Sequence, residues 1–338
     1  MTRLGELAPR FVESRERVVC VGGGHGLAAT LEAMRILGRY PVGVVSVADD
    51  GGSSGRLRES YKHIPPGDLR RCVAALLPDG SPWAPLLEYR FAGGELDGHA
   101  LGNLLYSAIY ASAQDAVQAA VGLASLVGAQ GLVLPAGNEP LTLSGRSCEE
   151  DGEVAGQVRV AQTPGISEIA LSPANPDVDP LVLEAIGAAT TIIFGPGSIF
   201  TSVLAVCKVP AIAQAVSTSP ARKLLVANLA SGAGEAEGLT LSRHVQLLEE
   251  AGARIDVVLY DDSAIEVGVE RSAASWARAE LAGPDGRMHD TTLLAKALSG
   301  LLAYTFGGDG RRRSIPRSCE LRPGPEWCCG TGLGFQAF

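Results

Sequence analysis

Hydrophobic positions along the chain form short runs that end in glycine and alternate with segments of helical spacing. Residues 17–21 form an apolar run typical of a buried strand, and glycines follow it. Residues 27–39 carry apolar side chains at helical spacing, and residues 42–47 form a second, β-branched run. A strand, a glycine-rich turn, a helix and a second strand in this order form a βαβ unit, and such units build parallel sheets. The pattern therefore predicts an α/β protein with a mainly parallel sheet.

The middle of the chain shows two other patterns. Helical spacing predicts a helical block at about residues 68–127, with helices at residues 68–77, 82–89, 101–113 and 115–127. Short apolar runs predict a small β-rich, antiparallel insertion at about residues 130–172, with strands at residues 130–135, 140–144, 153–161 and 166–172. Residues 48–67 lack either pattern and are expected to be rich in loops.

The α/β alternation resumes near residue 178. We expect helices at residues 178–188, 199–206, 241–251 and 291–304, and strands at residues 190–194, 211–216, 224–228 and 255–260. One α/β domain is thus predicted for residues 17–304, preceded by an N-terminal extension at residues 1–16. Residues 305–338 have no periodicity and are expected to form a disordered tail.

Composition excludes several classes of protein. The chain has 338 residues, of which 46% are apolar, and a net charge of −9. This favours a globular fold and disfavours binding to nucleic acid. Polar residues and glycines interrupt the longest apolar stretches, so no membrane span is expected. The polar opening residues do not match an export signal, and the seven cysteines show no zinc or disulfide spacing, so we expect a cytoplasmic protein.

The first stretch that could carry chemistry is Gly22-Gly23-Gly24-His25-Gly26, between a predicted strand and a predicted helix. Glycines at such a turn let backbone N–H groups approach an anion, and a phosphate is the natural ligand. The spacing does not fit G-x-G-x-x-G, because Leu27 stands where the last glycine would be. A tight turn that only needs positive φ is the structural alternative.

A second stretch, Asp49-Asp50-Gly51-Gly52-Ser53-Ser54, follows the second strand. Two adjacent carboxylates can hold Mg²⁺ beside a phosphate, because this hard ion prefers oxygen ligands. Ser53 and Ser54 could then cradle a second phosphate. Acidic residues that only cap a helix are the alternative.

A third stretch, Gly195-Pro196-Gly197-Ser198, also joins a strand to a helix. Two phosphate-competent turns in one parallel sheet suggest a ligand with a diphosphate at the carboxyl ends of the strands. Asp68 followed by Arg70 and Arg71, and the segment from His99 to Asn103, each open a predicted helix. An ordinary N-cap at Asp68 and a packing role for His99 remain open. No nucleophile elbow or zinc motif is present.

These motifs together resemble the gluconeogenesis-factor family, YvcK-like proteins within the superfamily of 2-phospho-L-lactate transferase. The resemblance runs from about residue 17 to residue 304 and includes Ala-Asp-Asp-Gly-Gly-Ser-Ser-Gly-Arg-Leu-Arg and Pro-Pro-Gly-Asp-Leu-Arg. It implies a three-layer α/β/α Rossmann-like fold that binds a UDP-sugar, chiefly UDP-N-acetylglucosamine. It also implies a role in cell shape and cell-wall precursor supply during gluconeogenic growth, and no settled catalytic activity comes with it.

The resemblance also assigns residues by position. The first turn, Asp49, Asp50, Ser53 and Ser54 would contact a diphosphate or a metal, and Asn138 and Arg222 would contact the sugar or the diphosphate. His25 stands where many members have Thr, which could make ligand affinity depend on pH near ~6.5. The candidate ligand-binding residues are Gly22, Gly23, Gly24, His25, Gly26, Asp49, Asp50, Ser53, Ser54, Asp68, His99, Asn103, Asn138, Gly195, Gly197, Ser198, Arg222 and Arg287, with Asp49 and Asp50 as candidate Mg²⁺ ligands.

Two functions from different classes follow. The first is a UDP-sugar-binding regulator, able to form a homo-oligomer, that acts through a protein partner the sequence does not identify. The second is a Mg²⁺-dependent transferase that moves a phospholactyl-type group from a nucleotide diphosphate donor onto a deazaflavin acceptor. An NAD-dependent oxidoreductase is a weaker third reading, because the first turn misses the dinucleotide fingerprint.

Overall fold

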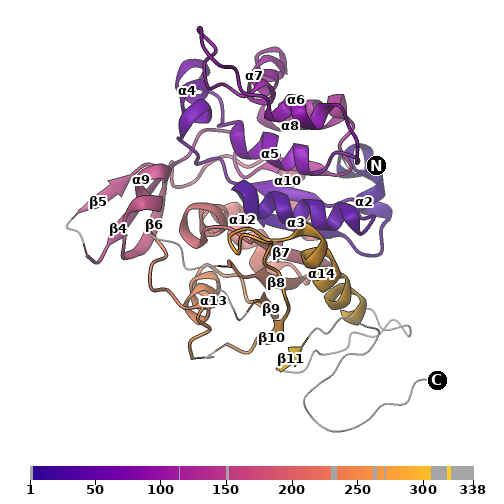
Figure 1. Cartoon of the computed structure of the whole chain (residues 1–338), viewed down its shortest axis with the longest axis vertical. Helices are drawn as coiled ribbons and strands as arrows, with labels where there is room; N and C mark the ends of the chain where they lie inside the picture. Colours follow the sequence, from indigo (N-terminus) through magenta and orange to yellow (C-terminus); the bar gives the residue numbers. More distant parts are fainter. Residues whose placement is uncertain are drawn as a thin grey trace.

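An eight-stranded parallel sheet forms the centre of the protein (Figure 1). The computed structural model describes residues 3–113, 115–149, 152–229, 234–261, 265–269, 272–305 and 318–320. The strand order is β11-β10-β9-β8-β7-β1-β2-β3, and each pair of neighbours is parallel. The strands are β1 Val18–Gly22, β2 Val42–Val45, β3 Leu132–Pro135, β7 Thr191–Phe194, β8 Arg222–Val226, β9 Val257–Tyr260, β10 Ser275–Arg278 and β11 Ser318–Glu320.

The order of strands reverses between β1 and β7. From β1 the chain steps to β2 in one direction, and from β7 it steps to β8 in the other. Because parallel crossovers are right-handed, this reversal places α3 (Gly24–Ile36) on one face of the sheet and α12 (Pro210–Thr218) on the other. Helix α14 (Thr291–Thr305) packs on α3, and α10 (Pro180–Ala188) packs on α12. The predicted α/β fold is thus confirmed, and the reversal is the place where such sheets bind ligands.

The helical block consists of α5 (Gly67–Ala75), α6 (Trp83–Glu88), α7 (Leu101–Ala113) and α8 (Ala116–Val127), at the top of Figure 1. The prediction of loops at residues 48–67 was wrong over part of this stretch, because α4 covers Gly52–Tyr61. Apart from two serines and Gly55, α4 buries only Leu57. It therefore has no apolar stripe from which the helix could be predicted.

The β-rich insertion is a three-stranded antiparallel sheet with one short helix. Its order is β5-β4-β6, and the elements are β4 Thr142–Ser147, β5 Glu153–Ala155, α9 Gln157–Gln162 and β6 Ile166–Ser172. Two predictions here were wrong. Residues 132–135 belong to the main sheet as β3, and residues 157–162 form a helix whose N-terminus is capped from outside the insertion by Asp50.

Residues 211–216 were predicted as a strand and form α12 instead. Pro210 opens this helix, where its missing N–H and fixed φ are favourable. Elsewhere the expected helices are present as η1 (Ile199–Leu204, a π-helix), its continuation α11 (Ala205–Cys207) and α13 (Leu241–Glu250).

Residues 3–13, within the predicted N-terminal extension, form two short helices that pack on the core. Helices α1 (Arg3–Leu7) and α2 (Pro9–Glu13) bury Leu4 and Phe11, and Arg3 pairs with Asp179 at 2.8 Å. At the other end, residues 306–317 and 321–338 of the expected tail lie outside the described residues, while residues 318–320 form β11.

In the described part of the chain, no single helix has the length and apolar composition to cross a membrane. The helical segments Ile199–Cys207 and Pro210–Thr218 reach that length only as a pair bent by 77°. Both bury apolar side chains in the core, among them Val203 and Ile212.

Candidate anion-binding site

The two glycine-rich turns lie against each other at the carboxyl ends of β1 and β7. The Thr30 hydroxyl donates to the Gly195 carbonyl at 2.7 Å. A Cβ atom on Gly26 would lie 2.1 Å from the Pro196 carbonyl oxygen, so this position has no room for a side chain. The two turns are therefore direct neighbours.

The first turn already holds a carboxylate from its own chain. Asp68 Oδ2 accepts the Gly24 N–H at 2.8 Å, at the start of α3, and Asp68 Oδ1 accepts from Arg71 Nη1 at 2.7 Å. Burial, followed by the neighbouring Asp49 charge, raises the pKa of Asp68. One of the N–H groups at the helix N-terminus that the sequence offered to a phosphate, that of Gly24, is therefore occupied by a carboxylate of the same chain.

The second turn is filled in the same way. The Gly197 N–H donates to Asn228 Oδ1 at 2.8 Å, and Ser198 Oγ accepts the Thr201 N–H at 3.1 Å. The buried Glu235 carboxyl lies beside Thr201, with 3.4 Å between the Thr201 hydroxyl and Glu235 Oε1. Burial raises the pKa of Glu235 to about 7.

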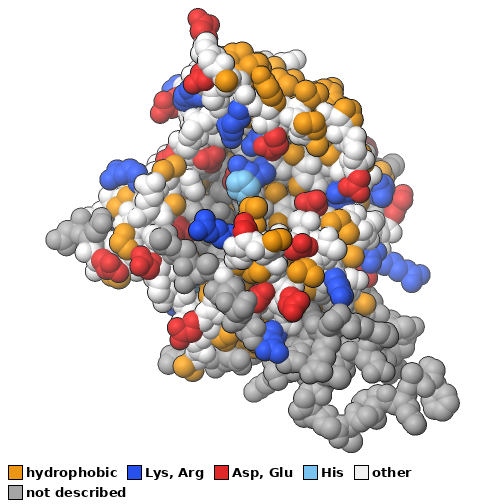
Figure 2. All heavy atoms as spheres, viewed as in Figure 1, with side chains coloured by type: hydrophobic (Ala, Val, Ile, Leu, Met, Phe, Trp, Pro, Cys, Tyr) orange, Lys and Arg blue, Asp and Glu red, His pale blue; other side chains and the backbone are white. Residues whose placement is uncertain are grey.

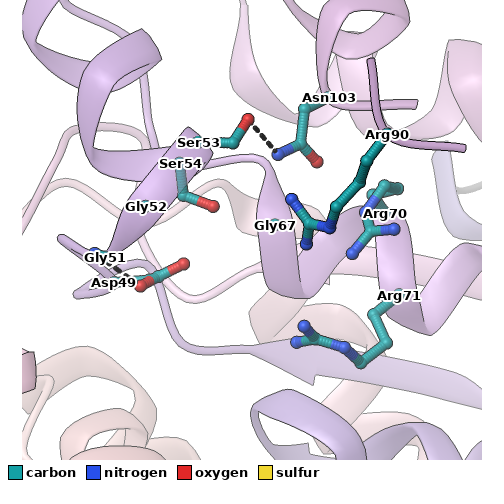
Figure 3. Close-up of a pocket in the computed structure, with 10 residues that line it drawn as sticks. All are labelled: Asp49, Gly51, Gly52, Ser53, Ser54, Gly67, Arg70, Arg71, Arg90 and Asn103. Atoms are coloured by element: carbon teal, nitrogen blue, oxygen red, sulfur yellow. Dashed lines mark hydrogen bonds between the residues drawn. The ribbon is translucent and has the colours of Figure 1, made fainter. Parts of the chain in front are cut away.

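An open cavity of about 240 Å³ lies one strand away, beyond the end of β2 and between the N-termini of α4 and α5 (Figure 3). In the space-filling view, basic side chains and a histidine gather near the hollow between the helical block and the three-stranded sheet (Figure 2). The cavity is lined by Asp49, Gly51, Gly52, Ser53, Ser54, Gly67, Arg70, Arg71, Arg90 and Asn103.

Three guanidinium groups and one carboxylate line this cavity. Arg70 is 1% exposed, forms an ion pair with Glu88 and donates to the Leu87 carbonyl at 3.3 Å, and burial lowers its pKa. Arg90 donates to the Gly98 carbonyl at 3.0 Å, and no described carboxylate lies within ion-pair distance of it. Arg70 and Arg71 are paired with Glu88 and Asp68, so Arg90 supplies the guanidinium charge of this cavity that has no described carboxylate partner, and this charge favours an anionic ligand.

A chain of hydrogen bonds covers one wall of the cavity. Asn103 Nδ2 donates to Ser53 Oγ at 3.0 Å, and Ser53 Oγ lies 3.0 Å from His99 Nδ1. Because Ser53 already accepts from Asn103, its own hydrogen is free for His99 Nδ1. Partial burial and the Arg56 charge lower the pKa of His99, which favours the neutral imidazole as acceptor.

The two adjacent aspartates point to different places. Asp49 lines the cavity and accepts the Gly51 N–H at 2.9 Å. Asp50 instead accepts the Gln157 and Val158 N–H groups, both at 3.0 Å, at the start of α9. Within the described ranges no group of three or more His, Cys, Asp or Glu side chains could hold a metal. Asp49 alone could hold Mg²⁺ only together with the phosphate oxygens of a ligand.

Other candidate residues lie outside the cavity. Arg222 is the first residue of β8, at the amino ends of the strands, whereas the glycine-rich turns lie at their carboxyl ends. It donates to the Leu301 carbonyl at 3.1 Å, so the structure does not bring it to the site. Asn138 follows β3, and its Nδ2 donates to Asp177 Oδ2 at 2.6 Å. Arg287 is exposed and does not line the cavity. His25 is exposed at the start of α3, and partial burial followed by the Arg71 charge lowers its pKa.

Arg90 is the cavity residue that the sequence did not indicate. It stands between two aromatic residues in a hairpin whose arms meet at the bridge between Arg90 and Ala100, and neither glycine nor helix spacing marks it. Arg70 and Arg71 were visible as basic residues in the first turn of a helix, where cations oppose the helix dipole.

The comparisons with known proteins cover this same part of the chain. The family model described as 2-phospho-L-lactate transferase CofD matches residues 18–296, a span that includes every residue lining the cavity. A protein of Mycobacterium tuberculosis with the name "Putative gluconeogenesis factor" is 38% identical over 312 residues, which cover 86% of this chain and 91% of that protein. This chain belongs to the gluconeogenesis-factor family, within the wider CofD family.

Other members of the gluconeogenesis-factor family agree with this assignment. The "Gluconeogenesis factor" of Listeria innocua is 33% identical over 241 residues, covering 70% of this chain and 74% of that protein. The crystal structure of a UPF0052 family member from Bacillus halodurans superposes with a TM-score of 0.77 at 29% identity, covering 85% of this chain and 99% of that chain. The fold is therefore that of this solved UPF0052 protein.

Proposed function

We propose that this protein binds a nucleotide sugar, with UDP-N-acetylglucosamine as the first candidate, and holds its diphosphate in the arginine cavity. The observation that carries the proposal is the convergence of Arg70, Arg71 and Arg90 on one cavity beside the single carboxylate of Asp49. Guanidinium groups bind phosphate oxygens in pairs of parallel hydrogen bonds, and the starts of α4 and α5 add backbone N–H groups.

Two buried polar atoms of the cavity residues support a ligand there. Asn103 Oδ1 and Arg70 Nε are buried and have no hydrogen-bond partner among the described residues. An unpaired buried polar atom costs about 1–3 kcal/mol. A phosphate oxygen would satisfy Arg70 Nε, and a sugar hydroxyl or an acetamido N–H would satisfy Asn103 Oδ1, which is the combination that a sugar diphosphate offers.

The proposed role is regulatory. The relatives carry the name of gluconeogenesis factors, and we assign this protein to the control of cell-wall precursor supply and cell shape during gluconeogenic growth, in the cytoplasm and through a protein partner. Ligand binding suits that role, because a sensor reports ligand concentration through its occupied fraction.

A calorimetric titration tests the proposal, with UDP-N-acetylglucosamine, UDP-glucose, GDP and NAD as ligands, each with and without Mg²⁺. We expect binding of the two UDP-sugars, and a thermal shift that corresponds to about 2.7 kcal/mol at 100 times the Kd. Arg243→Ala is a matched control, since this arginine lies on α13 and pairs with Glu250. Absence of UDP-sugar binding at millimolar concentration would refute the proposal.

A second candidate is a Mg²⁺-dependent transferase of phospholactyl type, and the match to the 2-phospho-L-lactate transferase model favours it. Asp49 would hold the metal against the donor diphosphate, and the metal would stabilise the leaving phosphate. Turnover with a guanosine diphosphate donor and a deazaflavin alcohol would support this function. Binding of GDP without transfer would count against it.

A further inference from the structure

The wall of the arginine cavity contains a paired hydroxyl and imidazole. Ser53 and His99 are 46 positions apart in the chain, and the fold brings Ser53 Oγ to 3.0 Å from His99 Nδ1. A serine hydroxyl within hydrogen-bond reach of a neutral imidazole is the arrangement by which proteins activate a nucleophile. The sequence shows no motif for this pair, since neither residue belongs to a known nucleophile signature.

The surroundings of Ser53 fit an alkoxide-like oxygen. Ser53 is the second residue of α4, a ten-residue helix, so the positive end of the helix dipole lies beside it. Asn103 Nδ2 donates to the same oxygen at 3.0 Å, and Asn103 is 1% exposed, so its position is fixed by packing. Each of these contacts stabilises negative charge on Ser53 Oγ.

The cavity also contains arginines that could stabilise the charge of a reacting phosphoryl group. Arg70, Arg71 and Arg90 face Ser54 and Asp49 across it, and Ser53 also lines it (Figure 3). Guanidinium groups on phosphoryl oxygens stabilise the charge that develops in phosphoryl transfer. The acceptor Asn103 Oδ1 in this wall is buried and has no hydrogen-bond partner among the described residues.

We propose that Ser53 is a nucleophile, with His99 as its base, that takes a sugar-phosphate group from a nucleoside diphosphate sugar. This inference rests on the proposed function, because the ligand must first occupy the cavity. The protein would then be its own acceptor, and the product is a phosphodiester between Ser53 and the sugar phosphate.

The step balances without any further reactant. Ser53 Oγ attacks the phosphorus that carries the sugar, and a new oxygen–phosphorus bond forms. The bond between that phosphorus and the bridging oxygen breaks, and the nucleoside monophosphate leaves with the electron pair. The serine proton passes to His99 Nδ1 and is then released to the leaving phosphate or to solvent.

The test is an acid-quenched incubation of the full chain with UDP-N-acetylglucosamine, followed by intact-mass measurement and fragment mapping. We expect a mass gain of one sugar phosphate on Ser53, with release of one UMP per protein. The gain should be absent in Ser53→Ala and slowed roughly 100- to 10,000-fold in His99→Gln, which can still hydrogen-bond but is not a base. Ser125→Ala, an exposed serine on α8, should react as the wild type does.

Calorimetry on Ser53→Ala separates the two proposals, because this variant keeps the arginines but cannot react. Binding by Ser53→Ala together with no mass gain in the wild type would overturn the inference and leave the proposed function standing. A mass gain at another residue, or an unchanged rate in His99→Gln, would also overturn it. No binding by either protein would remove the proposed function and the inference together.

Discussion

The Asp68 carboxylate and the Arg71 guanidinium, 2.7 Å apart, join the first glycine-rich turn to the arginine cavity. Asp68 accepts the Gly24 N–H with its other oxygen. An anion that draws Arg71 away from Asp68 would therefore also change the environment of the Gly24 N–H at the start of α3. This ion pair thus connects the cavity to the place where the strand order reverses, although the cavity itself lies beyond β2.

Arg90 is expected to contribute to affinity and little to stability. Arg90 is exposed, and its guanidinium has only the Gly98 carbonyl as a described hydrogen-bond partner. Arg90→Ala should weaken nucleotide-sugar binding about 10- to 100-fold, since a hydrogen bond to a charged group contributes roughly 1.5–3 kcal/mol. Calorimetry at two salt concentrations measures this, and an equal loss in the Arg243→Ala control would contradict a specific role.

Gly102 fixes the position of Arg70. A Cβ atom at Gly102 would lie 2.7 Å from Arg70 Cγ and 3.0 Å from Leu87 Cδ2, so Gly102→Ala should destabilise the fold by about 1–3 kcal/mol. It should also weaken anion binding, because Arg70 must move. Urea unfolding and calorimetry would measure the two effects.

Gly187 is the matched glycine for that experiment. It lies in α10, and a Cβ atom there would meet nothing within 4 Å. Gly187→Ala should stabilise the protein by roughly 0.5–1 kcal/mol through the helix preference of alanine, with unchanged ligand affinity. Equal destabilisation by both substitutions would show that space around Gly102 is not the cause.

Asp49 and Asp50, the two aspartates after β2, should have different functions. Asp50→Ala removes the cap of α9 and should cost about 0.5–2 kcal/mol of stability while leaving ligand affinity nearly unchanged. Asp49→Asn should leave stability nearly unchanged and remove any Mg²⁺-dependent part of binding. Thermal melts and titrations with and without Mg²⁺ on both variants check this, and a loss of Mg²⁺ dependence in Asp50→Ala alone would reverse the assignment.

Glu235 should make stability depend on pH. Burial raises its pKa from 4.5 to about 7, so the folded state binds a proton more tightly than the unfolded state. Glu235 therefore makes its full contribution to the free energy of unfolding below pH ~4.5. This contribution, about 3 kcal/mol, is lost as the pH rises through about 7. Glu235→Gln should therefore gain stability over the wild type at pH 8 but not at pH 4.5.

Denaturant unfolding of the wild type and Glu235→Gln at several pH values measures this difference. Glu250→Gln is the control, because Glu250 is exposed and pairs only with Arg243 among the described residues. Parallel stability curves for the wild type and Glu235→Gln would show that Glu235 titrates normally in the folded state.

The sequence indicated much of the sheet and both glycine-rich turns. Strands β1, β2 and β7 are buried on both faces, so nearly all of their residues are apolar. Such continuous apolar runs can be recognised from the sequence alone. Glycine at residues 22–26 and 195–197 likewise marks turns where the backbone must pass closely. Helices α4 and α12 were not predicted. The first has no apolar stripe, and the second begins with a proline and is apolar over most of residues 210–216.

Only the tertiary structure brought the residues of the arginine cavity together. In the turns that local sequence offered to phosphates, Asp68, Asn228 and Glu235 accept backbone N–H groups of residues that are distant from them in the chain. The open cavity combines arginines from α5 and from the hairpin before α7 with the loop after β2. Spacing along a sequence reports which backbone groups are available, whereas burial and charge pairing between distant segments determine which of them remain free for a ligand.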